Sequence, residues 1–73
     1  MNTYTTTDLH LAAFLIVRGH TLVEIGREKH GRFVFPTEAA VDAPKFFTNE
    51  MVGARDFASA LRQLKSALYA LKQ

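Results

Sequence analysis

The three histidines, which are the metal-ligand candidates of this chain, lack the spacing that a metal site needs. His10, His20 and His30 fall at the start of an expected helix, just past its end, and in an expected turn. That helix would be about 15 Å long at about 1.5 Å per residue, so His10 and His20 cannot reach the same ion. We therefore expect no metal site and no cofactor.

The hydroxyl and glycine residues also lack the arrangement that catalysis or phosphate binding needs. Ser59 and Ser66 have no histidine near them in the sequence, and there is no cysteine. The four glycines are dispersed, so no loop can present several consecutive amides to a phosphate. A chain of 73 residues rarely builds the enclosed pocket that catalysis uses. The sequence predicts a non-enzymatic protein.

Two groups of basic residues are the feature of the sequence that most strongly predicts binding of a ligand. Arg27, Lys29 and Arg32 gather at an expected hairpin tip. A second group falls on one flank of the expected last helix: Arg55, Arg62, Lys65, Tyr69 and Lys72. Phosphates attract such cations through counterion release, and a ring beside cations can stack bases. Binding of DNA or RNA is the function we rank first from the sequence.

The charge distribution singles out the same last segment. The formal net charge is +2, but residues 1–53 carry five Arg or Lys against six acids, whereas residues 54–73 carry four against one. The segments are therefore −1 and +3. The alternative explanation is that these cations form a solvated face whose stems cover the edge of the core. The sequence leaves both interpretations open.

The elements that must position these residues are an N-terminal helix, a β-hairpin, a short helix and a long C-terminal amphipathic helix. A run of threonines before Asp8 offers helix caps and Gly19 a helix end, which predicts a helix over residues 8–18. This helix is apolar nearly all round, so it must be covered on several sides. Alternating apolar residues predict strands over 20–25 and 32–37, with Phe33 and Phe35 on one face.

The second half of the chain predicts two more helices. Pro44 near a first turn, with Asp42 as a possible cap, indicates a short helix over residues 44–49. The spacing of Phe57, Leu61, Leu64, Leu68 and Leu71 predicts a strongly amphipathic helix over residues 54–71. The expected fold is α+β, in a single compact domain over residues 1–73.

Apolar residues in excess of what a small core can hide support a different class of function. Phe46 and Phe47 are adjacent, and neighbours on a helix point about 100° apart, so both cannot share one contact. Leftover apolar surface marks association sites. The alternative prediction is therefore a protein-interaction or homodimerisation module that uses Phe46 and Phe47.

The composition also bears on compartment. The chain has no cysteine, its start lacks the pattern of a secretion signal, and its longest apolar run, Leu11 to Val17, is far short of the roughly 20 residues that span a bilayer. We expect a cytoplasmic protein with no membrane contact.

Two stretches of the sequence match a known pattern. They run from Thr7 through Leu11-Ala12-Ala13-Phe14 to His20, and from Asn49 through Ala60-Leu61-Arg62 to Lys65. The chain thereby resembles a family of small bacterial and phage-associated domains of unknown function, over about residues 6–68. The resemblance implies a helix, hairpin, helix arrangement and carries no activity.

Overall fold

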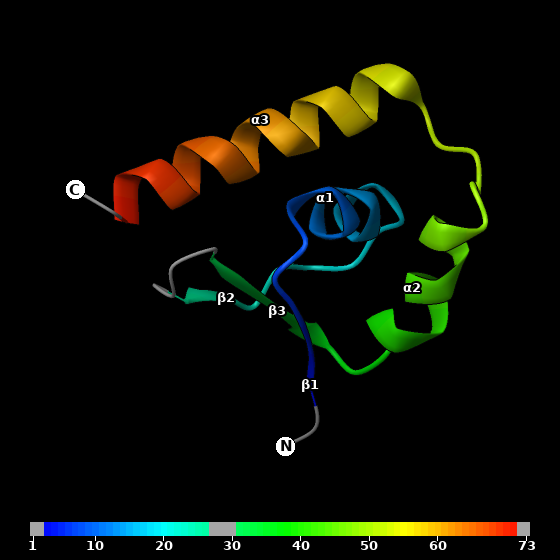
Figure 1. The fold of residues 1–73 in the computed structure, drawn as a ribbon, viewed down its shortest axis with the longest axis horizontal. Helices are drawn as coiled ribbons and strands as arrows, with labels where there is room; N and C mark the ends of the chain where they lie inside the picture. The colour runs from blue at the N-terminus through cyan, green and yellow to red at the C-terminus, as the bar shows by residue number, and fades with distance from the viewer. Residues whose placement is uncertain (1–2, 27–30, 72–73) are drawn as a thin grey trace.

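The fold is α+β, as the sequence predicts, with three helices and one small antiparallel sheet in the described residues (Figure 1). The structure, a computed structural model, describes residues 3–26 and 31–71. In chain order the elements are β1 (Thr3–Thr6), α1 (Leu9–Val17), β2 (Glu24–Gly26), β3 (Arg32–Pro36), α2 (Ala39–Phe47) and α3 (Ala54–Leu71).

Thr5 and Thr6 lie in strand β1, which the sequence did not predict, and the Thr6 hydroxyl also accepts a hydrogen bond from the backbone N–H of Asp8 at 3.1 Å. β-branched residues suit a strand, and β1 pairs antiparallel with β3. The cap of α1 is Asp8, whose carboxylate accepts hydrogen bonds from the backbone N–H groups of His10 and Leu11 at 3.0 and 3.2 Å. The bounds of α1 are within one residue of the prediction.

The sheet presents two phenylalanines to the core. Its strand order is β1-β3-β2, and both strand pairs are antiparallel. Phe33 and Phe35 lie on the same face of the central strand, and both are fully buried, which confirms the predicted alternation. β2 is shorter than expected, because residues 20–23 lie outside the strand, although the N–H of Val23 still bonds the Val34 carbonyl.

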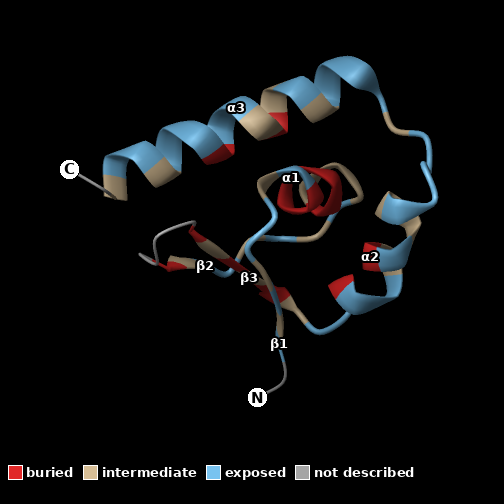
Figure 2. Cartoon of the chain, in the orientation of Figure 1, coloured by how far each residue is buried: buried red, intermediate tan, exposed pale blue. Residues whose placement is uncertain are grey.

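Helix α1 is the centre of the molecule. Its buried residues are Leu11, Ala12, Ala13, Phe14 and Leu15. The sheet, α2 and α3 surround it, as Figures 1 and 2 show. This arrangement confirms the prediction that a helix apolar on every side must be covered on several sides.

Helix α3 has the predicted bounds and crosses the molecule from α2 to the hairpin. Leu64 is 2% exposed, and Phe57, Leu61 and Leu68 pack partly buried against the core. At its far end Leu68 lies on Gly31, where an added Cβ would come within 2.9 Å of the leucine side chain. Gly31 also has a φ of +79°, which glycine adopts without strain.

Helix α2 spans residues 39–47, so the predicted short helix over 44–49 is wrong. Asp42 lies inside the helix and does not cap it, and Pro44 is also internal. Proline removes a hydrogen bond to the carbonyl four residues earlier, at Ala40. Ala40 and Pro44 are both exposed, so water can reach the Ala40 carbonyl. The helix ends before Asn49, whose φ of 63° is the left-handed conformation that closes helices.

Candidate interaction surfaces

The structure describes only some of the basic residues that the sequence predicts to bind nucleic acid. Arg27, Lys29 and Lys72 lie outside the described residues. Arg32 is partly buried on β3, and its guanidinium lies 3.6 Å from the carboxylate of Glu24 on the neighbouring strand. Its charge is therefore already compensated within the sheet.

The remaining predicted cations lie exposed along α3. Arg55, Arg62 and Lys65 are on the helix flank about 100 to 180° from Leu64, and none has an acidic partner within 4.0 Å among residues 3–26 and 31–71. Tyr69 is on the same flank and is 69% exposed. We call these four residues the basic flank. It extends about 21 Å from the first residue to the last.

Helix α2 buries two alanines and exposes two larger apolar residues. Ala39 and Ala43 face the core and are 0% and 4% exposed. Val41 and Phe47 are 73% and 70% exposed, and Met51, just past the helix, is 89% exposed. We call Val41, Pro44, Phe47 and Met51 the outer face of α2. Figure 2 shows α2 at the periphery of the molecule with pale blue, exposed segments along it.

Phe46 and Phe47 have different environments, as expected for neighbours on a helix that cannot share one contact. The Phe46 ring packs on Phe14 of the core, with ring centroids 5.7 Å apart. The Phe47 ring meets Phe46 edge-on at 5.2 Å and otherwise faces solvent. The turn of about 100° between neighbours on a helix accounts for this split.

A cluster of charged side chains fixes α2 to the end of α1. The Asp42 carboxylate lies 2.6 Å from Nε2 of His20, 3.4 Å from the Arg18 guanidinium and 3.1 Å from Nζ of Lys45. Arg18 also lies 3.7 Å from Glu50, which follows α2. Asp42 thus joins α2 to residues that end and follow α1.

The cluster keeps Asp42 ionised. The hydrogen bond from His20, followed by that from Lys45, lowers the pKa of the Asp42 carboxyl from 3.8 to about 2, and the charges of Lys45 and Arg18 act in the same direction. The Asp42 side chain is only 15% exposed. At neutral pH its negative charge therefore holds the side chains of His20 and Arg18 against α2, beside Lys45 of the same helix.

The sequence did not predict this cluster. His20 and Asp42 are separated by 22 residues, and no local pattern pairs them. His10 also has a structural contact, because its ring stacks on Phe57 of α3 with centroids 6.4 Å apart. His30 lies outside the described residues. In the described part of the chain no three His, Cys, Asp or Glu residues are grouped so that they could hold a metal ion.

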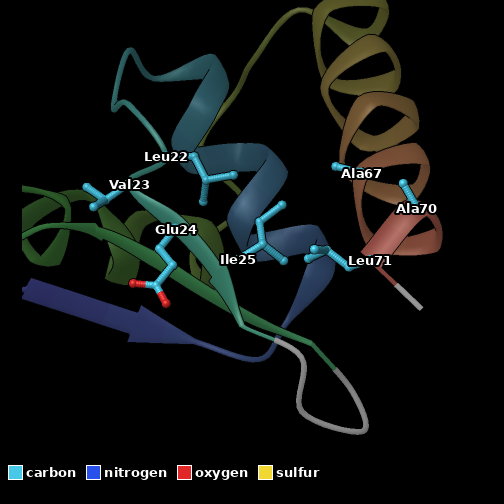
Figure 3. A pocket seen from close by; sticks show the side chains of 7 residues that line it. All are labelled: Leu22, Val23, Glu24, Ile25, Ala67, Ala70 and Leu71. Atoms are coloured by element: carbon cyan, nitrogen blue, oxygen red, sulfur yellow. The ribbon is translucent and has the colours of Figure 1, made fainter. Parts of the chain in front are cut away.

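A shallow apolar groove lies between α3 and the segment that leads into β2 (Figure 3). One hollow of about 490 Å³ adjoins another of about 500 Å³, and both are bordered by Leu22 and Ala67. Val23, Ile25, Ala70 and Leu71 complete most of the first hollow. These walls are mainly hydrocarbon, so the groove offers little to orient a polar ligand.

Comparison with known proteins places the chain in a family. The family model described as a domain of unknown function (DUF5659) matches residues 1–70. The chain belongs to this family. The predicted resemblance to domains of unknown function is thereby confirmed at that level, and the DUF5659 description names no ligand or reaction. No curated protein and no solved structure matches the chain.

Within residues 3–26 and 31–71, no helix is long and apolar enough to cross a membrane.

Proposed function

We propose that this protein is a non-catalytic protein-interaction module whose contact surface is the outer face of α2. The observation that carries the proposal is the exposure of Val41 and Phe47 on α2, and of Met51 just past it, while α2 buries Ala39 and Ala43. Protein interfaces are enriched in Phe and Met and depleted in charge at their centres. The outer face of α2 has this composition.

The free energy of burial supports a covering partner. Complete burial of a Val, Phe or Met side chain stabilises by about 1.5–3 kcal/mol relative to exposure. The folded chain leaves most of that free energy unused at Val41, Phe47 and Met51, although its stability is only ~5 kcal/mol for a domain of this size. A protein that covers these three side chains would recover it.

The ion cluster beneath the helix supports the same proposal. Asp42 contacts His20 and Arg18, which both lie outside α2, and these two contacts fix the rotation of α2 about its own axis. A surface whose orientation is set before binding loses less conformational entropy when the partner arrives. The outer face of α2 is therefore preorganised.

Photocrosslinking in cells of the source organism tests this proposal. Phe47 is replaced by p-benzoylphenylalanine in one variant and Tyr69 in a matched control, because the two side chains are 70% and 69% exposed. We expect protein adducts from position 47 and none from position 69. Absence of any protein adduct at position 47 overturns the proposal.

A second candidate function is nucleic-acid binding through the basic flank. It is favoured by one specific observation, which is that Arg55, Arg62 and Lys65 are exposed without acidic partners in the described part of the chain. Tyr69 beside them can stack on a base. The flank is about 21 Å long, which matches several phosphates of an extended strand.

Charge reversal tests this second candidate. The triple variant R55E/R62E/K65E should lose binding to a labelled oligonucleotide that the wild type binds at low salt. Failure of the wild type to bind in a salt-dependent way would remove this candidate. In the photocrosslinking experiment, a nucleic-acid adduct at position 69 would support it.

The proposed setting is the cytoplasm of a bacterium or a phage-infected cell. The lack of cysteine supports an intracellular, reducing compartment. The genes next to that of this protein would identify the process in which its partner acts, and a set of secretion or envelope genes would count against the cytoplasm.

A further inference from the structure

Strand β2 is an edge of the sheet, and the shallow apolar groove lies beside it. The strand order is β1-β3-β2, so in the described part of the chain β2 has a strand neighbour on one side only. Residues of a strand point their backbone N–H and C=O groups alternately to its two sides, so some of these groups in β2 and Val23 face away from β3. Together these four residues give about 13 Å of open edge.

The groove opens toward a ligand that lies alongside this edge. Figure 3 shows the side chains of Leu22 and Ile25 pointing toward α3 across the hollow of about 490 Å³. Two of the three residues that border this hollow from α3 are alanines, Ala67 and Ala70, and both are exposed. The space between α3 and β2 can therefore accept apolar side chains from outside.

The charges near the groove exclude an ionic ligand. Among the described residues that line this hollow, Glu24 is the one with a charge, and its carboxylate lies 3.6 Å from the Arg32 guanidinium. The basic flank is on the other side of α3, because Lys65 is about 100° from Leu64 in one direction and Ala67 about 60° in the other. A nucleic acid would find no lysine or arginine among the described residues of the lining, so the groove suits an uncharged, apolar ligand.

An extended segment of a protein fits both the edge and the groove. Its backbone can bond the open edge of β2 as an added strand, and its alternate side chains then share the face of the sheet where the groove lies. A helix bonds its backbone groups internally, so it would cover the groove and leave the edge unpaired. A lipid chain or another small apolar molecule would also leave the edge without hydrogen bonds.

We propose that β2 and the groove beside it form a second interaction site, which binds an extended apolar segment of another protein as a strand added to the sheet. Backbone hydrogen bonds to β2 supply affinity, and the side chains that enter between Ile25 and Ala67 supply specificity. Figure 1 shows β2 and α2 on opposite sides of the molecule, so this site is separate from the outer face of α2. The inference therefore goes beyond the proposed function and does not depend on it.

Short random peptides displayed on phage test the site, with the purified full chain as the target. Ala67→Glu places a charge in the groove, and Ser66→Glu is the matched control, because Ser66 is also exposed but lines neither hollow. We expect enriched peptides with apolar residues at every second position. They should bind Ser66→Glu as well as the wild type, and Ala67→Glu about tenfold more weakly. If no enriched peptide distinguishes the two variants, the proposal is overturned.

Backbone methylation of an enriched peptide tests strand addition without altering the chain. One peptide is N-methylated at its odd positions and another at its even positions, so each loses the hydrogen-bond donors of one edge. Since only one edge of an added strand faces β2, we expect one of the two peptides to lose binding and the other to keep it. Equal loss or equal retention would indicate a helix or a purely apolar contact, and would overturn the proposal.

Sedimentation and photocrosslinking separate this inference from its alternatives. Self-association of the wild type that Ala67→Glu abolishes and Ser66→Glu retains would overturn the choice of another protein and identify a second copy as the strand donor. Protein adducts at Phe47 without any peptide sensitive to Ala67→Glu would remove this inference alone. A sensitive peptide without adducts at Phe47 would remove the proposed function alone.

Discussion

Replacing Phe46 and Phe47 by Ala, one at a time, should separate the core side of α2 from its outer face. Phe46 packs on Phe14, which is 2% exposed, so its removal leaves a cavity beside the core. Truncation of a buried Phe costs about 3–5 kcal/mol, and the lower end applies because Phe46 is only partly buried. We expect Phe46→Ala to cost about 3 kcal/mol.

The loss at the neighbouring position should be much smaller. Phe47 is 70% exposed, and its one ring contact is edge-on to Phe46. Such an aromatic pair is worth about 0.5–1.5 kcal/mol, so Phe47→Ala should cost about 1 kcal/mol. Both variants replace Phe by Ala at adjacent positions, so the gain in helix propensity is nearly the same in each. The difference between their free energies of unfolding therefore reports on packing.

Urea denaturation followed by circular dichroism measures the difference. For a domain of this size the free energy of unfolding falls by about 1 kcal/mol per molar urea, so the midpoint should drop by about 3 M for Phe46→Ala and by about 1 M for Phe47→Ala. With ~5 kcal/mol to lose, both variants remain folded in water. Equal shifts, or a larger shift for Phe47→Ala, would show that α2 is rotated and that its outer face is misassigned.

Two further substitutions test the core and the ion cluster. Leu64→Ala should lower the free energy of unfolding by about 2–5 kcal/mol, because Leu64 is buried. The control Lys65→Ala, on the exposed side of the same helix, should lower it by less than about 0.5 kcal/mol. An unchanged melting temperature for Leu64→Ala would refute the assignment of the buried face of α3. Because folding lowers the pKa of Asp42 from 3.8 to about 2, its contribution to stability is complete above pH 3.8 and is lost as the pH falls toward 2. Asp42→Asn should lower the melting temperature at pH 7. It should also reduce the fall in melting temperature between pH 3.8 and pH 2, and a fall as large as that of the wild type would count against the cluster.

Local patterns in the sequence were sufficient for the parts of the fold that depend on neighbours along the chain. The three and four residue spacing from Phe57 to Leu71 fixes both the length of α3 and the side that it buries. Asp8 and Gly19 bracket α1, and alternation places Phe33 and Phe35 on one face. The exposed position of the basic flank follows from the same helical period.

Features that depend on distant partners could not be predicted in this way. β1 forms because β3, nearly thirty residues later, offers it an edge, and threonines suit both a strand and a helix cap. Pro44 suggested a helix start because proline is usually excluded from helix interiors. Its position inside α2 is tolerated on an exposed side of the helix, and no local pattern shows that exposure. The contact of His20 with Asp42, and hence the rotation that turns Phe46 inward and Phe47 outward, arises only when α1 and α2 pack together.

Hydroxyl-radical footprinting tests the central claim that protein covers the outer face of α2. Phe47, Met51 and Tyr69 all react with the radical and are 70%, 89% and 69% exposed. The account predicts that all three react readily in the dilute purified chain, and that in cells of the source organism Phe47 and Met51 become protected relative to Tyr69. Reaction of Phe47 and Met51 at the same rate relative to Tyr69 in both settings would contradict it.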